Sequence, residues 1–417
     1  MKHLLSLATA VVFSAVLGAA DIYVDYNNGK PNAAGTKDAP LDILARAINK
    51  AKPGDTIYVL PSDKPIRDAI VFRGKSGQPG KPITVDGMNN IFLGSLPLSP
   101  KEWKEIKPGY FACTRKVGSN MTGRYFMTLK GKIVRMGRFN KAKGGAKFKT
   151  IDELQPGEWT IIRGDVVDQK SKSKHPASYH QYVIRLPEGA TGLAEAGFEE
   201  PILRRISGVD IAKDSSNITI RNVIVKHFHN DGYNFHGNCR NIVLENIAAV
   251  ECGDDAISAH ETCEIKVKNM VAIRCSTAIC HINKSENYHE NVYAEGILGQ
   301  DILCTENSTN TLKNAWFKAD SIGGFRLTTR KDTNQKFEIK NLRMINRNPK
   351  AVFNIQSPGK LDVDFSDVKI ANFKTIHKFF NNKVTVVKAE DIEAEIAEAR
   401  ERLFAIFGGQ LEKALGE

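Results

Sequence analysis

The chain has 417 residues, of which 41% are hydrophobic and 25% are charged, and its formal net charge is +12. This length can bury one large core or two ordinary ones, and the composition excludes both a disordered chain and a bundle of membrane helices. The positive charge would suit nucleic acid, an anionic surface or an acidic glycan, but it is equally consistent with a basic, soluble surface that has no such partner.

Residues 1–20 have the features of a secretory signal. A short polar start precedes an apolar run over residues 4–17, and Gly18-Ala19-Ala20 supplies the small residues of a cleavage site. The apolar run is too short to span a bilayer comfortably, so an uncleaved anchor is only the alternative. We therefore expect a secreted or periplasmic protein whose mature chain starts near Asp21 and has no membrane contact after signal cleavage. Export also argues against nucleic acid as a partner.

Residues 21–100 predict an N-terminal cap followed by the first coils of a strand-rich fold. The alternation over residues 21–26 is typical of a strand, and residues 40–51 form a helix candidate with Pro40 near its first turn. A Pro-Gly-Asp turn at residues 53–55 separates this helix from another short strand. This opening resembles the N-terminal cap of right-handed parallel β-helix proteins, in which a helix covers the open end of the stacked strands.

Residues 101–205 interrupt this pattern. They contain Trp103 and Trp159, together with hairpin-like stretches at residues 125–134 and 182–186. We predict an inserted β-rich region, which either packs beside the main fold or is built from long loops.

Residues 206–388 carry a repeat of short alternating strands with an asparagine at a fixed phase. The asparagines follow one another at intervals of 24, 23, 22, 23 and 27 residues: Asn222, Asn246, Asn269, Asn291, Asn314 and Asn341. This period indicates a solenoid of stacked coils about 4.8 Å apart. Asparagine tolerates left-handed turn geometry, and its amide can hydrogen-bond to the asparagines above and below. The predicted fold class is therefore all-β, a right-handed parallel β-helix.

Residues 389–417 predict a C-terminal amphipathic helix. Over residues 390–407, five apolar residues fall on one stripe: Ile392, Ile396, Ala399, Leu403 and Phe407. We expect this helix to cover the C-terminal end of the solenoid or its side, and a partner-binding helix is the alternative.

The sequence contains seven cysteines, six of them between Cys239 and Cys304, and none forms a CxxC zinc pattern. The intervals from Cys239 to Cys263 and from Cys252 to Cys275 match the repeat. We expect each pair to stack in adjacent coils as small core residues, and disulfides are the alternative after export.

The repeat brings three carboxylates to nearly one phase. Asp231 and Asp255 each lie nine residues after their repeat asparagine, and Asp254 lies eight residues after its own. Because residues of equal phase form a column along a solenoid, Asp231 should lie next to Asp255 with Asp254 beside them. Closely spaced carboxyl groups can divide into a proton donor and an ionised base, as glycoside hydrolysis requires. We predict that these aspartates are catalytic; the alternative is that they only mark Asp-Gly turns.

Polar residues at nearby phases are predicted to bind the substrate. His236 and His260 each follow their asparagine by fourteen residues, whereas His281 and Arg326 follow theirs by twelve. Together with Asn234 they would line a groove along the side of the solenoid. The histidines could instead hydrogen-bond to the aspartates or support the turns. No HExxH spacing is present, so we expect no metal or other cofactor, with a bound calcium ion as the weaker alternative.

Three short runs resemble sequences of the pectin-lyase-like superfamily of right-handed parallel β-helices. His229-Asn230-Asp231-Gly232 and Gly253-Asp254-Asp255 resemble the Asn-Thr-Asp-Gly and Gly-Asp-Asp motifs of glycoside hydrolase family 28, the polygalacturonase type. Asn234-Phe235-His236-Gly237 is similar to an Asn-x-His-Gly run of the family 110 α-galactosidases, which also carry β-rich insertions.

The resemblance implies an inverting hydrolase in which Asp254 is the general acid, while Asp231 and Asp255 hold and deprotonate the water. The chain departs from family 28 at two substrate contacts. Cys280-His281-Ile282 lacks the glycines of a Gly-His-Gly motif, and Arg326-Leu327-Thr328 has threonine where that family has lysine. The expected partner is a galactose- or uronate-containing glycan, and the net charge favours an anionic one, either sulfated or uronic.

Two other functions remain open. A polysaccharide lyase on the same fold would need a basic side chain to remove a proton from the sugar, and Arg274, Lys284 and Arg326 are candidates. A non-catalytic β-helix would bind a glycan without cleaving it.

Overall fold

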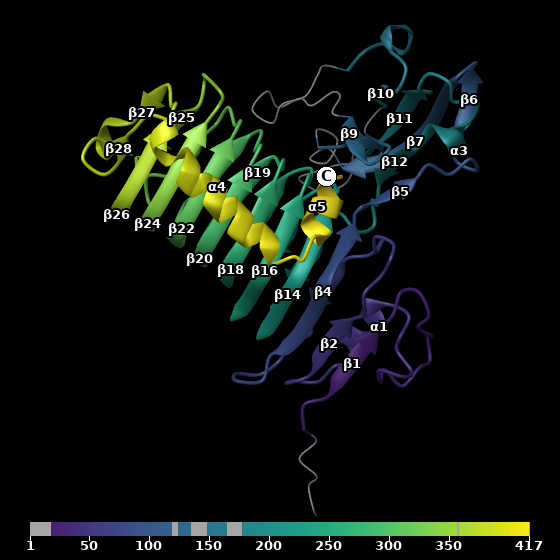
Figure 1. The fold of residues 1–417 in the computed structure, drawn as a ribbon, viewed down its shortest axis with the longest axis horizontal. Coiled ribbons are helices and arrows are strands. Elements are labelled where there is room, and N and C mark those ends of the chain that lie inside the picture. Colours follow the sequence, from purple (N-terminus) through teal and green to yellow (C-terminus); the bar gives the residue numbers. More distant parts are fainter. Residues whose placement is uncertain (1–17, 119–123, 135–147, 165–176, 357, 417) are drawn as a thin grey trace, which may run out of the picture.

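The computed structural model describes residues 18–118, 124–134, 148–164, 177–356 and 358–416, and its main body is a parallel β-helix (Figure 1). The described strands of this solenoid form two long parallel sheets, one of eleven strands and one of nine. All but the first and the last coil contribute one strand to each sheet, and neighbouring strands in a sheet come from successive coils. The predicted fold class, an all-β parallel β-helix, is confirmed.

Both sheets follow the chain coil by coil. The eleven-stranded sheet contains β1 (Asp21–Val24), β2 (Thr56–Val59), β4 (Ile83–Leu93), β14 (Ile218–Lys226), β16 (Ile242–Val250), β18 (Glu264–Ile273), β20 (Glu286–Glu295), β22 (Thr309–Ala319), β24 (Asn334–Asn346), β26 (Lys360–Ala371) and β28 (Thr385–Val386). The nine-stranded sheet contains β3 (Ile70–Arg73), β13 (Val209–Ala212), β15 (Tyr233–Phe235), β17 (Asp255–Ala259), β19 (Thr277–His281), β21 (Gln300–Thr305), β23 (Phe325–Thr328), β25 (Val352–Gln356) and β27 (Thr375–Ile376).

The repeat asparagines form a ladder along the eleven-stranded sheet. Each one bends its strand with a positive φ, for example 55° at Asn222 and 60° at Asn269. The Nδ2 of each asparagine donates to the Oδ1 of the asparagine one coil earlier, at 2.8 to 3.2 Å. Asn222, the first of the six, donates instead to Asp86 at 2.9 Å. The predicted turn geometry and amide stacking are both confirmed, and because every coil repeats them they fix the register of the solenoid.

The interior of the solenoid is filled by columns of side chains from successive coils. Most of these side chains are aliphatic, as expected for a parallel sheet that is buried on its inner face. All seven cysteines lie in the described part of the chain, and all are buried with free thiols. The thiols of Cys239 and Cys263 are neighbours across adjacent coils, as are those of Cys252 and Cys275, which agrees with the predicted stacking.

The inserted region leaves the solenoid after β4 and returns before β13, and it is β-rich as predicted. Its strands form two antiparallel four-stranded sheets. One contains β6 (Lys104–Lys107), β7 (Tyr110–Gly118), β10 (Trp159–Ile162) and β11 (Ala177–Arg185), and the other β5 (Ser95–Pro97), β8 (Met127–Leu129), β9 (Lys132–Val134) and β12 (Phe198–Pro201). A separate aromatic core that includes Trp103, Tyr125, Trp159 and Tyr182 holds the region together. Figure 1 shows it beside the N-terminal coils.

Helices occupy the N-terminal end and one side of the solenoid (Figure 1). Helix α1 (Leu44–Lys50) packs against β1, β2 and β3, as expected for the predicted capping helix. The C-terminal helices α4 (Glu390–Ala405) and α5 (Gln410–Leu415) lie across the outer face of the eleven-stranded sheet. The predicted apolar stripe of α4 is buried against Ala248, Val271 and other sheet residues. The C-terminal helix therefore covers the side of the solenoid.

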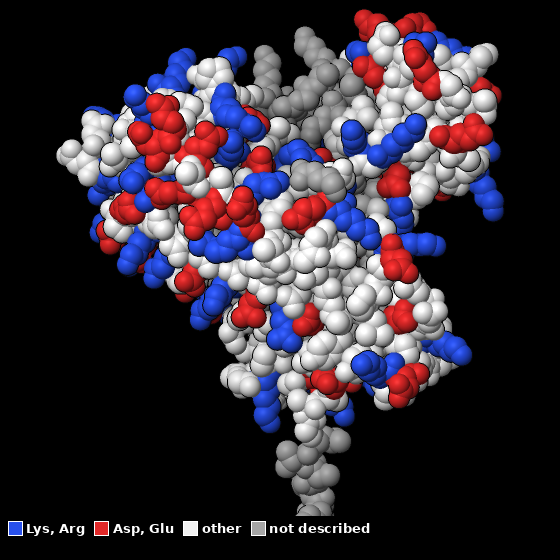
Figure 2. All heavy atoms as spheres, in the orientation of Figure 1, with Lys and Arg blue, Asp and Glu red and all other residues white. Residues whose placement is uncertain are grey.

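Acidic and basic side chains are mixed with one another on the face that carries α4. Figure 2 shows acidic and basic side chains interspersed over the C-terminal coils and a largely uncharged surface over the N-terminal coils. The net charge is therefore not gathered into one basic patch on this face. No helix in the described part of the chain is both long and apolar enough to cross a membrane.

Candidate active site

The three predicted aspartates meet where the chain passes from the eleven-stranded sheet to the nine-stranded sheet. Asp231 lies in the segment between β14 and β15, and Asp254 and Asp255 lie one coil later, where β17 begins. One carboxylate oxygen from each of the three lies within 4.8 Å of the other two. We call these residues the acidic cluster. All three are buried, so charge repulsion within the cluster is only weakly screened by water.

Backbone contacts between the two coils hold this cluster in place. The N–H of Asp254 donates to the carbonyl of Asn230 at 3.0 Å, and the N–H of Gly232 donates to the carbonyl of Asp255 at 2.8 Å. Gly253 cannot carry a side chain, because a Cβ there would lie 2.1 Å from the carbonyl oxygen of His229. The glycine of the Gly-Asp-Asp run is thus needed for the close approach of the coils that brings the carboxylates together.

The carboxylates are held by specific donors. Asp231 accepts the backbone N–H of Asp255 at 3.1 Å through Oδ1 and the side-chain amide of Asn230 at 2.9 Å through Oδ2. Arg124 places Nη2 at 2.5 Å from Oδ2 of Asp254, and its Nη1 donates to Oδ1 of Asn230 at 2.5 Å. One guanidinium therefore bridges the two coils, with Asn230 as the shared partner of Arg124 and Asp231.

Arg124 comes from the inserted region, and it was not among the site residues predicted from the sequence. In the solenoid, β4 lies beside β14, and β13 lies beside β15. The inserted region joins β4 to β13, so it takes the place of the segment that would connect the two sheets in the coil before Asp231. Tyr125 anchors the neighbouring backbone, since its ring stacks on Tyr182 at 4.1 Å and meets His229 edge-on at 5.3 Å. One feature of the sequence could have pointed to a contact of this kind: the region is inserted directly before the coils that carry the aspartates.

Asn234 and Arg326 lie on the outer face of the nine-stranded sheet, in one column of register partners with Ser258, Cys280 and Leu303. Arg326 is four strands from Asn234, or about 19 Å at the usual strand spacing. Asn234 Oδ1 and Arg326 Nε are both buried without a hydrogen-bond partner among the described atoms. Unsatisfied polar atoms are rare in folded proteins, so these two groups are candidates for ligand contacts.

His281 does not reach this face, contrary to the prediction. It is fully buried in the solenoid interior, where its Nε2 lies 2.8 Å from Nε2 of His289. Its register partner is Ala259, whereas Cys280 is the residue that pairs with Ser258 on the outer face. Cys280 follows Asn269 by eleven residues, one fewer than in the neighbouring coils. A slip of one residue moves a side chain to the opposite face of a strand, so counting from the asparagine assigned His281 to the wrong face.

His236 and His260 come together, but at the other end of the short strands. His236 follows β15 and His260 follows β17, whereas the acidic cluster lies where these strands begin. The two rings stack with their centroids 4.1 Å apart. Burial, followed by the neighbouring His236, lowers the pKa of His260 to about 4. We call His236, His260 and the adjacent Glu261 the histidine cluster.

The three basic residues proposed for a lyase lie elsewhere. Arg274 pairs with Glu251 at 2.9 Å, in a charged cleft between the solenoid and β9. Lys284 is exposed, and Arg326 lies three strands from the strand of Asp255. A basic side chain that does contact the acidic cluster is that of Arg124, through Asp254.

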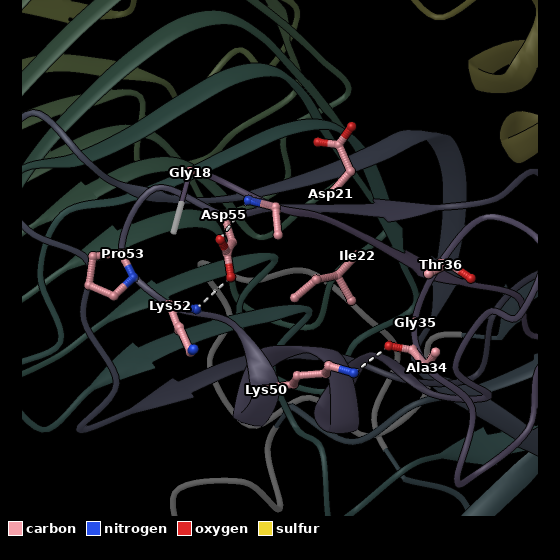
Figure 3. A pocket seen from close by; sticks show the side chains of 11 residues that line it. Gly18, Asp21, Ile22, Ala34, Gly35, Thr36, Lys50, Lys52, Pro53 and Asp55 are labelled. Atoms are coloured by element: carbon pink, nitrogen blue, oxygen red, sulfur yellow. Dashed lines mark hydrogen bonds between the residues drawn. The ribbon is translucent and has the colours of Figure 1, made fainter. Parts of the chain in front are cut away.

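A pocket at the N-terminal end of the solenoid is remote from both clusters (Figure 3). Asp55, on its wall, accepts the backbone N–H groups of Ala20 and Lys52, each at 2.8 Å. Its carboxylate is therefore used to hold the first turns of the chain, and we assign the pocket no function.

Comparison with known proteins finds distant similarity to solved structures. No protein-family model and no curated protein sequence matches this chain. Among solved structures, XylC in complex with xylose is 12% identical, with a TM-score of 0.48 over 85% of this chain and 69% of that one. Pectate lyase Pel9A is 12% identical, with a TM-score of 0.44 over 90% and 80%. A glycoside hydrolase is 9% identical, with a TM-score of 0.42 over 86% and 97%.

Proposed function

We propose that this protein is a carbohydrate-active enzyme, a glycoside hydrolase that acts on a galactose- or uronate-containing glycan. The observation that carries the proposal is the meeting of three buried carboxylates from two adjacent coils, with oxygens within 4.8 Å of one another. Carboxyl groups this close share protons, so that one can donate while another accepts. Secretion through residues 1–20 belongs to the same proposal.

The proposed reaction assigns a role to each aspartate. Asp254 donates its proton to the glycosidic oxygen as the bond to the anomeric carbon breaks. A water molecule held by Asp231 and Asp255 attacks that carbon from the opposite face, and its proton passes to one of these two carboxylates. The products are a new reducing end and a released hydroxyl, with inverted configuration at the anomeric carbon.

The spacing of the carboxylates places a condition on inversion. Inverting enzymes usually separate their two carboxyl groups by about 6.5–9.5 Å, and retaining enzymes by about 5–5.5 Å. The nearest oxygens of the acidic cluster lie closer together than the inverting range. Inversion here therefore requires the water to bind beside Asp231 and Asp255 rather than between two widely spaced groups.

Arg124 suggests the class of substrate. A guanidinium 2.5 Å from a carboxylate favours the ionised form, whereas the proposed role of Asp254 needs a proton. An anionic group on the sugar, a carboxylate or a sulfate, would compete for the planar fork of the guanidinium. We infer that such a group draws Arg124 away from Asp254, which can then carry the proton. This supports an anionic glycan as the substrate.

The test is a screen of the chain from Asp21 against neutral, uronic and sulfated glycans, in which reducing ends and ultraviolet absorbance are measured in parallel. We expect new reducing ends without absorbance, and a loss of about 10²–10⁴-fold in Asp254→Asn. Asp320→Asn is the matched control, because Asp320 also lies between the two sheets but is paired with Arg347 outside the cluster. Equal losses in both variants would remove Asp254 from the mechanism.

A lyase is the second candidate, and the acidic cluster itself favours it. Three carboxylates at one point are also the ligand type that calcium prefers, and a lyase could use such an ion to neutralise a uronate while a basic group takes the C5 proton. Arg124 is a basic group in direct contact with the cluster. Absorbance from an unsaturated product, abolished by a chelator, would establish this reaction and rule out the hydrolase.

A further inference from the structure

The histidine cluster is a set of ligating side chains that the proposed hydrolysis does not use. One ligand atom each from His236, His260 and Glu261 lies within 4.8 Å of the other two. Nδ1 of His236 is 3.2 Å from Oε2 of Glu261, and the ring of His236 stacks on that of His260. The three residues come from two adjacent coils, as the aspartates do, but they follow β15 and β17 instead of preceding them.

We propose that His236, His260 and Glu261 bind a divalent transition-metal ion of the zinc type. Two imidazoles and one carboxylate are a ligand set that zinc takes in proteins, with the fourth position left to water or substrate. The acidic cluster offers oxygen ligands alone and would select a hard cation such as calcium. The two clusters therefore differ in the kind of ion that they can hold.

The spacing of the donors suits a tetrahedral ion. Bonds of about 2.0–2.2 Å to nitrogen and oxygen place two ligands of such an ion about 3.3–3.5 Å apart. The 3.2 Å between His236 Nδ1 and Glu261 Oε2 is close to this value. A metal ion could therefore take the place of the shared proton between His236 and Glu261, while the ring of His260, which now stacks on His236, would rotate to direct a nitrogen at the ion.

The ligands are already oriented by neighbouring groups. The hydroxyl of Ser258 lies 2.7 Å from Nε2 of His260, so the nitrogen left for a metal ion is Nδ1. Oε2 of Glu261 accepts the backbone N–H of Gly237 at 2.9 Å. Partners of this kind fix the ring orientation of a ligating histidine and the direction of a carboxylate, which reduces the entropy lost on binding.

The exposure of the ligands also fits a metal site. The side chains of His236 and Glu261 are 42% and 49% exposed. Solvent can therefore reach the fourth position, as can a hydroxyl or carboxylate oxygen of a glycan lying along the sheet. The proposal does not depend on the hydrolase assignment.

The experiment is a titration of metal-free protein, residues 21–417 without a histidine tag, with Co²⁺, read by visible absorbance and by displacement with Zn²⁺. We expect one equivalent with the absorption of a low-symmetry nitrogen-containing site. His260→Gln and His236→Gln should each weaken binding at least about tenfold, because each removes a ligand. Since His236 is partly exposed, its replacement should leave the fold intact, which circular dichroism would verify.

Two control variants separate this site from other sources of binding. His377→Gln removes a partly exposed histidine at the far end of the solenoid, and Asp254→Asn alters the acidic cluster. Both should bind Co²⁺ as the wild type does. The proposal is overturned if the double variant His236→Gln/His260→Gln still binds as tightly, or if Asp254→Asn abolishes the cobalt spectrum.

Discussion

The coils after residue 206 and the inserted region build their parts of the proposed active site in different ways. The coils repeat one local pattern, so Asp231 and Asp255 occupy almost the same place in consecutive turns. The inserted region has antiparallel sheets and its own aromatic core, and it delivers Arg124 across 130 residues of sequence to Asp254. The solenoid thus supplies the carboxylates of the proposed site, and the insertion supplies the positive charge that contacts one of them.

The largest expected effect is the loss of turnover when a carboxylate of the solenoid coils is replaced. Asp254→Asn keeps the size of the side chain but cannot donate the proton, so we expect turnover of an accepted glycan to fall by about 10²–10⁴-fold. The measurement is the initial rate of reducing-end release, compared with that of Asp320→Asn. If Asp254→Asn retained more than a tenth of the wild-type rate, the acidic cluster would have a structural role only.

A buried carboxyl group in the interior of the solenoid should make the free energy of unfolding depend on pH. Burial raises the pKa of Asp301 to about 7, while hydrogen bonds from Asn346 and the nearby Ser321 oppose this shift. Because the folded pKa lies above the unfolded value, Asp301 stabilises the fold most at low pH, and this contribution is lost as pH rises through 7. Between about pH 4 and pH 7, we expect the stability of the wild type relative to Asp301→Asn to fall by about 1.4 kcal/mol per pH unit.

Urea unfolding of both proteins at several pH values would measure this difference. The comparison with Asp301→Asn is needed because the buried His289, whose pKa is lowered to about 3 by burial, changes stability in the opposite direction over part of this range. Parallel curves for the two proteins would mean that Asp301 is ionised in the folded state throughout.

Arg124 tests whether the inserted region takes part in the chemistry. Arg124→Lys keeps the charge but loses the planar fork, so we expect a loss of about 10–100-fold, equivalent to one charge-assisted hydrogen bond, on anionic glycans. Lys132→Ala, an exposed substitution on β9, is the control from the same region. An equal effect of Arg124→Lys on neutral and anionic glycans would contradict the proposed competition for the guanidinium.

The smallest effect is expected in the asparagine ladder. Asn269 donates to Asn246 at 2.8 Å and accepts from Asn291 at 2.9 Å, with a φ of 60°. Asn269→Gly should cost about 1–2 kcal/mol of unfolding free energy through the lost hydrogen bonds. Asn269→Ala should cost about 1 kcal/mol more, because alanine is disfavoured at positive φ. Chemical denaturation of both variants would separate the cost of the lost hydrogen bonds from the cost of a positive φ in alanine. Equal stabilities of the two variants would show that the positive φ contributes nothing.

Much of the solenoid could be predicted from the sequence because its signals are local and repeated. The asparagine phase predicted the ladder and the meeting of the three aspartates, and the apolar stripe of α4 is buried as expected. The prediction failed at His281, where one coil is a residue shorter and the side chain points inward.

Other parts of the site left no periodic signal. The contact of Arg124 with Asp254 depends on the tertiary placement of the inserted region, where no repeat phase applies. The stacking of His236 on His260 followed from their equal phase, but their contact with Glu261 depends on the turn after β17. Hydrogen-bond register is therefore a better guide to a solenoid face than the distance in sequence from a turn residue.

The proposed inverting hydrolysis is tested most directly by NMR spectroscopy of the first accepted glycan during turnover, which identifies the anomeric form of the new reducing end. We expect a saturated product whose configuration is initially inverted, and no such product with Asp254→Asn. An unsaturated sugar would instead show elimination, and a retained configuration would show that one aspartate attacks the sugar itself. Either result would contradict the proposed roles of the acidic cluster.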